Sequence, residues 1–221
     1  MNPLHPWGAA RALRLGAATL ALASTMLLAG CEVLLLGGAV VGTGLVATDR
    51  RTAGTQLEDE SIALKAESRA RALATLGRID VTSYNRVALV TGEVPAEADR
   101  AAVEKAVAGV ENVRSVVNEL AVGPNASLGQ RSSDSVLTGK VKASLVDAKD
   151  LQANAFRVVT ERGIVYLMGR VTEREARRAA EVARGVAGVQ KVVTVFEILS
   201  EEELARLGRA VAPPAAASAP R

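Results

Sequence analysis

The sequence predicts an α+β protein that contains two copies of one small α-β-β-α-β domain, each a three-stranded mixed sheet covered by two helices. The same order of elements occurs twice, offset by roughly 77 to 79 residues. In each copy two β-branched runs are joined by a short turn, and an Ala-rich helical stretch separates them from a third run. A glycine falls late in the second run of both copies, at Gly92 and Gly169, where a missing side chain permits a bulge or the close approach of a helix.

The first copy is predicted to begin with a helix whose apolar residues recur at helical spacing: Ile62, Ala66, Leu73 and Leu76. Strands at 79–84 and 86–94 follow, separated by Tyr84-Asn85-Arg86. A second helix ends near Gly109, and the chain returns as a third strand from Val113. The final strand therefore arrives by a helical crossover.

The second copy repeats this order with clearer local signals. Asp134 is predicted to cap a helix whose apolar residues are Val136, Leu137, Val141 and Leu145. Gly163 can take the positive φ that a tight hairpin after Glu161 needs. Thr172 and Glu175 have the spacing of a capping box.

The N-terminal segment has the three parts of a bacterial export signal. Arg11 and Arg14 supply the basic region, residues 15–28 are uncharged, and small residues precede Cys31. The ending Leu28-Ala29-Gly30-Cys31 resembles a lipobox, which implies cleavage before Cys31 and acylation of this residue. The alternative is an ordinary cysteine that happens to follow a signal peptide. Because Cys31 is the only cysteine, no intramolecular disulfide can form.

The resulting organisation has six segments. They are a signal peptide at 1–30, a lipidated anchor and Gly-rich tether at 31–56, a first domain at 57–122, a linker at 123–132, a second domain at 133–199, and a mostly disordered tail at 200–221. About 190 residues remain after cleavage, enough for two small domains.

Composition argues against an enzyme. The only histidine, His5, lies in the signal peptide, so the mature chain offers neither imidazole nor free thiol. The sequence therefore predicts no catalytic residue, no metal site and no cofactor. The formal charge of +3 includes Arg11 and Arg14, so the mature chain is close to neutral and a nucleic-acid partner is not expected.

Several short motifs resemble those of the BON-domain family. They are Ala47-Thr48-Asp49, Val81-Thr82-Ser83-Tyr84, Val165-Tyr166-Leu167-Met168-Gly169 and Val171-Thr172-Glu173-Arg174-Glu175-Ala176. Two such domains behind a lipobox resemble the dual-BON outer-membrane lipoproteins. The resemblance implies a lipid-anchored protein that faces the periplasm, is concentrated at division sites and supports envelope integrity. Glu32, in place of the aspartate that retains lipoproteins at the inner membrane, favours sorting outward.

The resemblance also implies that the second domain binds anionic phospholipid through its first helix, next to an aromatic residue. Val136 occupies the aromatic position here, and a valine anchors less well at the headgroup level. Charge supports lipid contact, because residues 57–122 sum to −3 and residues 123–199 to +4. The predicted site is Val136, Leu137, Lys140, Val141, Lys142 and Leu145.

Two alternatives stay open. The apolar face of this helix could simply be core, with solvated lysines beside it. The protein could also be a periplasmic interaction adaptor that engages envelope or division proteins and has no lipid recognition beyond its acyl anchor. Arg174, Arg177, Arg178 and Arg184 could form a second anion patch, but near-helical pairing with Glu173, Glu175 and Glu181 is favoured.

Overall fold

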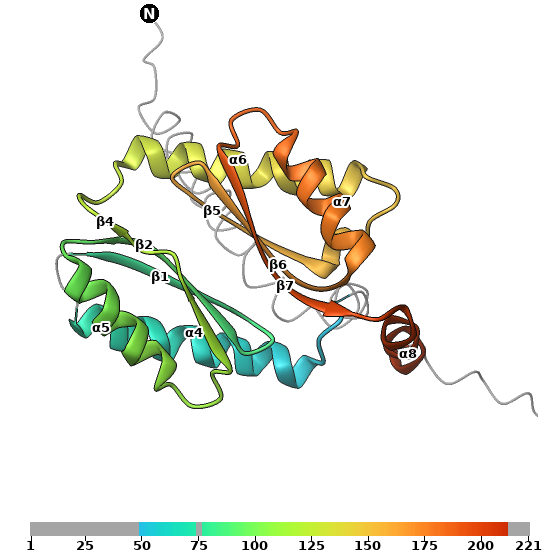
Figure 1. Ribbon diagram of the computed structural model, residues 1–221, viewed down its shortest axis with the longest axis horizontal. Helices are drawn as coiled ribbons and strands as arrows, with labels where there is room; N and C mark the ends of the chain where they lie inside the picture. The colour runs from blue at the N-terminus through green and yellow to red at the C-terminus, as the bar shows by residue number, and fades with distance from the viewer. Residues whose placement is uncertain (1–48, 74–76, 212–221) are drawn as a thin grey trace, which may run out of the picture. The chain divides into compact units, whose positions relative to one another are not determined.

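The computed structural model describes residues 49–73 and 77–211. The α-β-β-α-β order occurs twice in this part of the chain, which confirms the predicted fold class (Figure 1). The predicted signal peptide, Cys31 and most of the tether lie outside the described residues, as does the end of the tail.

The first repeat forms a four-stranded mixed sheet with two helices. Its elements are α4 (Ala53–Leu73), β1 (Arg78–Tyr84), β2 (Val87–Val94), α5 (Glu97–Ala108), β3 (Ser115–Asn118) and β4 (Ala121–Val122). β1 is antiparallel to β2, whereas β3 and β4 are both parallel to it. The single third strand of the prediction is therefore two short pieces. Leu120 lies between them and turns into the core, while its N–H donates to Oδ1 of Asn118.

The second repeat forms a regular three-stranded sheet. Its elements are α6 (Leu128–Asp147), a 3-10 turn η1 (Ala153–Ala155), β5 (Phe156–Glu161), β6 (Ile164–Thr172), α7 (Glu173–Arg184) and β7 (Lys191–Leu199), followed by α8 (Glu201–Val211). β5 is antiparallel to β6, and β7 runs parallel to β6 from Ile164–Lys191 to Thr172–Leu199. α6 begins within the segment predicted as a linker, because the hydroxyl of Ser127 accepts from the N–H of Gln130 and caps the helix there.

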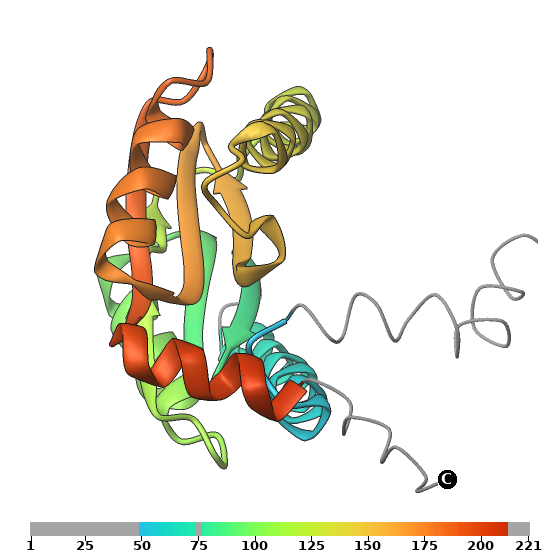
Figure 2. The same cartoon turned by 90° about the vertical axis from the view of Figure 1, so that its right-hand side faces the viewer.

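One face of each sheet packs against the helices of its own repeat. α4 and α6, the first helices of the two repeats, are seen nearly end-on in Figure 2. The two helix–sheet cores consist mainly of small side chains, such as Ala66, Ala70 and Val107 in the first and Ala179 and Ala183 in the second. Short side chains bring each helix close to its sheet, which is why glycine and alanine recur in both repeats.

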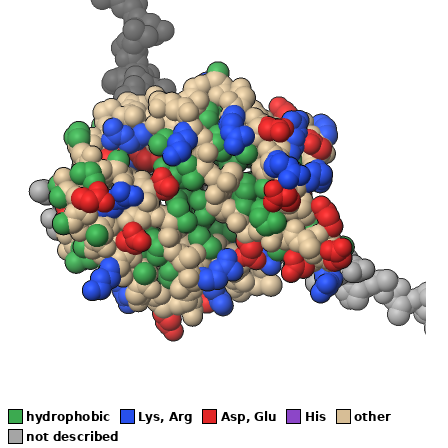
Figure 3. Space-filling model, in the orientation of Figure 1, with side chains coloured by type: hydrophobic (Ala, Val, Ile, Leu, Met, Phe, Trp, Pro, Cys, Tyr) green, Lys and Arg blue, Asp and Glu red, His purple; other side chains and the backbone are tan. Residues whose placement is uncertain are grey.

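A third apolar cluster combines residues of both repeats. It contains Tyr84 and Leu89 from the first sheet and Tyr166 and Met168 from the second. Figure 3 shows hydrophobic side chains gathered in the middle of the face drawn, over β7. The repeats therefore share buried apolar surface in addition to their separate cores.

Polar contacts join the two repeats at the edges of this cluster. Glu197 of β7 accepts from Nδ2 of Asn85 at 2.7 Å and from Nη2 of Arg114 at 2.8 Å, both in the first repeat. Its other oxygen accepts from Nε of Arg170 at 3.0 Å. Burial alone would raise the pKa of Glu197, but these three donors outweigh it and leave the pKa below its usual value. Elsewhere Arg78 of β1 forms an ion pair with Glu161 of β5.

The glycines at equivalent positions of β2 and β6, Gly92 and Gly169, lie against neighbouring backbone. A Cβ atom on Gly169 would lie 2.5 Å from the carbonyl oxygen of Ala155, and one on Gly92 would lie 1.9 Å from that of Arg78. Gly92 also has φ of +117°, a conformation that other residues rarely adopt. Both positions therefore bring backbone against backbone. The neighbour of Gly169 belongs to the 3-10 turn η1, whereas the neighbour of Gly92 belongs to strand β1 and not to a helix.

A candidate lipid-facing surface on the second domain

The six residues predicted to contact lipid divide between two faces of α6. Val141 and Leu145 are fully buried and Leu137 is only 7% exposed. Val141 and Leu145 belong to the helix–sheet core of the second repeat. Val136, Lys140 and Lys142 are instead exposed to solvent. Leu137, Val141 and Leu145 therefore pack inside the domain. The apolar stripe seen in the sequence is the face of α6 that points to the core.

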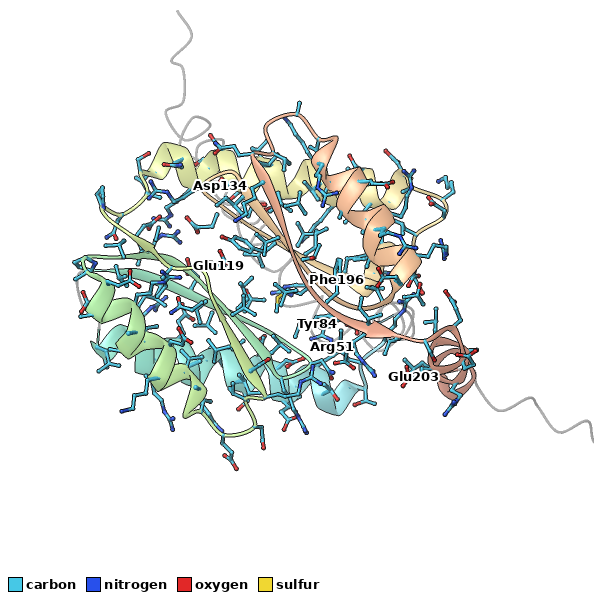
Figure 4. The ribbon with its side chains drawn as sticks, in the orientation of Figure 1. Arg51, Tyr84, Glu119, Asp134, Phe196 and Glu203 are labelled. Atoms are coloured by element: carbon cyan, nitrogen blue, oxygen red, sulfur yellow. The ribbon has the colours of Figure 1, made fainter. Side chains whose placement is uncertain are left out.

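The buried face of α6 also explains Asp134. The prediction that Asp134 caps the helix is wrong, because it lies well inside α6 and Ser127 is the cap. Asp134 shares the buried face, and its carboxylate accepts the N–H groups of Arg162 and Gly163 at 2.8 Å each (Figure 4). It therefore fixes the β5–β6 turn, in which Arg162 and Gly163 both have positive φ.

Asp59 has the same role in the first repeat. Its carboxylate accepts from the N–H groups of Asn85 and Arg86, at 2.7 and 2.8 Å, and from the hydroxyl of Ser83. Asn85 and Arg86 also have positive φ, although neither is glycine. A buried aspartate on the first helix of each repeat thus fastens the hairpin to that helix. The spacing from each aspartate to its hairpin turn is similar, at 26 and 27 positions in the first repeat and 28 and 29 in the second, and this is the sequence signal for the contact.

The opposite side of α6 carries the apolar residues that solvent can reach. Leu128, Val136 and Val146 are 75%, 60% and 61% exposed. Gly139 and Ala143 lie between them at every third or fourth position, and both are exposed. We call these five residues the outward face of α6. The sequence reading missed Leu128 and Val146 because it followed the longer apolar stripe, which belongs to the core.

Basic side chains flank the outward face without acidic partners. Among the described residues, neither Lys140 nor Lys142 forms an ion pair. The arginines of α7 behave differently, because Arg177 pairs with Glu173 and Arg178 with Asp150. Arg178 also pairs with Glu181 at 3.6 Å, so the predicted pairing at helical spacing holds for these two arginines. On α6, by contrast, Lys140 and Lys142 are both without an acidic partner in the described part of the chain.

A shallow cavity of about 600 Å³ adjoins the outward face. Val136 and Lys140 line it together with the hydroxyls of Ser132 and Ser133, and the loop before β7 contributes Gln190. A small amphipathic group can therefore lie against both an aliphatic and a cationic side chain at this end of α6.

The segment before α4 is fixed to the second repeat. Nη1 and Nη2 of Arg50 lie 2.8 and 2.7 Å from the two carboxylate oxygens of Glu175. Glu175 also completes the capping box of α7 with Thr172, which confirms that predicted motif. Neighbouring Arg51 pairs with Asp49 and Asp59, and its guanidinium lies 4.0 Å from the ring centre of Tyr84 (Figure 4). Sequence alone gave no signal for the Arg50–Glu175 contact, which spans 125 positions.

Two kinds of feature are absent from residues 49–73 and 77–211. No cluster of three or more histidine, cysteine or acidic side chains there could hold a metal ion. No helix in these ranges is both long and apolar enough to cross a bilayer.

Comparison with known proteins shows the family. The model of the BON domain matches residues 59–124 and 133–200, which correspond to the two repeats. The chain belongs to the BON-domain family. It is 39% identical over 181 residues to the outer membrane lipoprotein DolP of Haemophilus influenzae, covering 80% of this chain and 93% of that protein. It is also 36% identical over 151 residues to a 21 kDa hemolysin of Actinobacillus pleuropneumoniae, covering 67% of this chain and 78% of that protein.

These matches show a chain with two BON domains that is similar over most of its length to an outer membrane lipoprotein. They extend over both repeats and thus agree with the internal duplication that the sequence predicts. Acylation at Cys31 and the residues that contact lipid stay predictions, since Cys31 lies outside the described part of the chain.

Proposed function

We propose that the protein is a membrane-tethered binding module whose second BON domain contacts anionic phospholipid through the outward face of α6. Acyl chains on Cys31 hold it at the outer membrane, facing the periplasm, and the bound state supports envelope integrity and cell division. The module has no catalytic role in this proposal.

The observation that carries this proposal is the combination of exposed aliphatic residues and unpaired lysines on one helix. Val136 and Val146 are more than half exposed, although removing either apolar side chain from water would be favourable. Lys140 and Lys142 extend from the two sides of the same face and keep their charges uncompensated within the described chain. A shallow apolar strip between cations is suited to the boundary between headgroups and acyl chains.

The expected affinity of this face by itself is modest. Each lysine near an anionic surface contributes on the order of 1 kcal/mol. Val136 adds less than an aromatic residue would, because an indole or phenol matches the polarity of the headgroup region. The acyl anchor compensates by raising the effective concentration of the domain at the bilayer. Weak contact is therefore sufficient to keep the second domain at the membrane surface.

Vesicle co-sedimentation of the unacylated chain tests the proposal. Binding is expected to vesicles containing phosphatidylglycerol and to be weak on pure phosphatidylcholine. Val136→Glu combined with Lys140→Glu should abolish binding, because it replaces an apolar and a cationic contact with negative charge. The fold should survive, since both side chains are exposed. A matched variant on the first domain, Leu64→Glu with Lys65→Glu, changes the same residue classes on exposed positions of α4 and should bind normally. Undiminished binding of the α6 variant would remove the proposed surface.

An adaptor function is the second candidate, and one observation favours it. β3 and β7 each pair on one side only, and both line a cavity of about 310 Å³ that contains Val117, Val193 and Val195. An open strand edge with apolar side chains can accept an extended peptide. A specific complex that survives in the lipid-binding-deficient α6 variant would favour this function over direct lipid recognition.

A further inference from the structure

A second cavity lies where the segment before α4 meets the second domain. Its volume is about 330 Å³, and four separate stretches of chain line it. Asp49 and Arg51 come from the segment before α4, Tyr84 from β1, and Lys142, Phe156 and Arg157 from the second domain. We call it the junction pocket. It is distinct from the cavity beside Val136 and Lys140, with which it shares no lining residue.

The charges in the junction pocket are unequally compensated. Arg51 is neutralised, because it binds Asp49 at 2.8 Å and Asp59 at 2.8 Å. Asp49 is the only acidic side chain among the lining residues, and its carboxylate is occupied by Arg51. Lys142 and Arg157 are both exposed and form no ion pair within the described residues. Two free cations therefore face a pocket whose one carboxylate is already satisfied.

The remaining walls of the pocket are apolar or aromatic. Leu145 and Val158 are buried, and Val146 of the outward face of α6 forms part of the rim. Partial enclosure by apolar groups lowers the local dielectric constant and strengthens the attraction between a cation and a bound anion. The planar guanidinium of Arg157 can bind two phosphate oxygens at once, while the ammonium of Lys142 acts as a point charge.

We propose that the junction pocket binds one phosphate group between Lys142 and Arg157, and that the pocket is complete only while residues 49–51 are held against the second domain. The group is a phosphate ester, either a phospholipid headgroup or a free phosphate. The headgroup case extends the proposed lipid function to a second contact, and the free-phosphate case does not depend on it.

The contact between Arg50 and Glu175 positions the first wall of this pocket. Arg50 also donates to the carbonyl oxygen of Arg170 at 2.8 Å, and Arg170 donates to the carbonyl oxygen of Arg50 at 3.1 Å. These bonds fix the backbone on both sides of Arg50, and so place Asp49 and Arg51. Arg50 does not line the pocket itself and is a positioning residue.

The location suits a membrane-proximal ligand. Residues 32–48 connect Cys31 to Asp49, and a fully extended chain of that length reaches at most about 60 Å. Asp49 is thus the part of the pocket closest in sequence to the predicted anchor. A phosphate ester at the membrane surface would meet the pocket at high effective concentration.

The test is an NMR titration of the unacylated chain with inorganic phosphate and, separately, with glycerol 3-phosphate. Shifts are expected for Tyr84, Phe156 and Arg157. Lys142→Gln with Arg157→Gln should weaken phosphate binding at least tenfold. The matched control is Arg184→Gln with Lys191→Gln, which removes two exposed charges that do not line the pocket and should leave binding unchanged. Equal loss in both variants, or loss in neither, would overturn the proposal.

Two further arms separate the parts of the proposal. Arg50→Met should weaken phosphate binding although Lys142 and Arg157 remain, and near-UV circular dichroism checks that the domains stay folded. Unchanged phosphate affinity in folded Arg50→Met would show that the pocket is not composite. Vesicle binding by the unaltered chain without any phosphate binding would reject the pocket and leave the proposed lipid function standing. Vesicle binding that persists in Arg157→Gln while phosphate binding is lost would assign the pocket to free phosphate and not to a lipid headgroup. Phosphate binding by a chain that binds no vesicles would support the pocket and reject the proposed lipid function.

Discussion

Arg50 and Glu175 form a bidentate ion pair, with both side chains buried, between the start of the described chain and the first turn of α7. The same carboxylate accepts the N–H of Thr172 and so caps the helix. One acidic side chain therefore both begins α7 and holds the segment that leads toward the predicted membrane anchor. Substitution of either residue is therefore expected to affect both the second domain and the segment before α4.

Arg50→Ala should lower the free energy of unfolding by about 3 kcal/mol, because it leaves the buried carboxylate of Glu175 without its partner. Urea denaturation followed by circular dichroism measures the change. Arg177→Ala is the control, since its pair with Glu173 is exposed and should contribute less than about 1 kcal/mol. Similar losses in the two variants would show that the Arg50 pair is no more important than a surface pair.

Asp134→Ala should destabilise the protein by about 2 to 3 kcal/mol, because two N–H groups of the β5–β6 turn lose their acceptor. Hydrogen exchange at Gly163 should accelerate in the same variant. Asp59→Ala should have a corresponding effect on Asn85 and Arg86 in the first repeat. Asp150→Ala, at an exposed site, serves as the control. Unaltered exchange at Gly163 would contradict the assigned role of Asp134.

Stability should decrease in acid in a manner that depends on Glu175. Burial raises its pKa, but hydrogen bonds from Arg50 and Thr172 outweigh that effect and leave the pKa below 4.5. The folded state therefore favours the ionised form, so the stabilisation is complete above the pKa of the unfolded chain and is lost as pH falls through the folded-state value. Glu175→Gln should flatten the decrease in unfolding free energy below about pH 4.5.

Glu161 gives the opposite sign and provides the comparison. Burial raises its pKa above 4.5 even though Arg78 acts to lower it. Protonation of Glu161 therefore favours the folded state, and Glu161→Gln should make the acid-induced loss of stability steeper. A pH series of denaturation midpoints for the two variants measures both effects. Identical pH profiles would show that neither carboxylate controls acid stability.

Substitution by alanine should have opposite effects on stability at two glycines of the second domain. Gly139→Ala should stabilise the protein by up to about 1 kcal/mol, because the site is helical and nothing lies within 4 Å of the added Cβ. Gly169→Ala should be destabilising, since its Cβ would lie 2.5 Å from a backbone oxygen. Melting temperatures of the two variants distinguish the effects. Destabilisation by Gly139→Ala would mean that the outward face of α6 is covered in solution.

Val136→Trp should increase binding to phosphatidylglycerol vesicles several-fold, because an indole partitions to the headgroup region more favourably than a valine. The new tryptophan also reports insertion by a blue shift of its fluorescence. Leu64→Trp on α4 is the matched control, with a similar exposed fraction of 61% before substitution. Equal vesicle binding by the two variants would argue against α6 as the membrane-facing helix.

The repeat, the hairpins and the capping box of Thr172 and Glu175 could all be predicted from the sequence. These features depend on neighbouring residues, through periodicity, turn geometry and helix-end hydrogen bonds, so local patterns carry the information. Gly92 and Gly169 were recognisable for the same reason. Asp134 was misassigned because a buried acceptor for a distant turn and a helix cap use the same residue type.

The two faces of α6 could not be distinguished from the sequence, because periodicity identifies an apolar stripe without saying what covers it. Tertiary packing against β5 and α7 assigned Leu137, Val141 and Leu145 to the interior and left Leu128, Val136 and Val146 outside. Sequence by itself determined the duplicated fold, and the prediction of acylation at Cys31 depends on sequence alone. Only the tertiary structure decided which side of α6 is exposed and that Arg50 meets Glu175, since both depend on contacts between residues far apart in the chain.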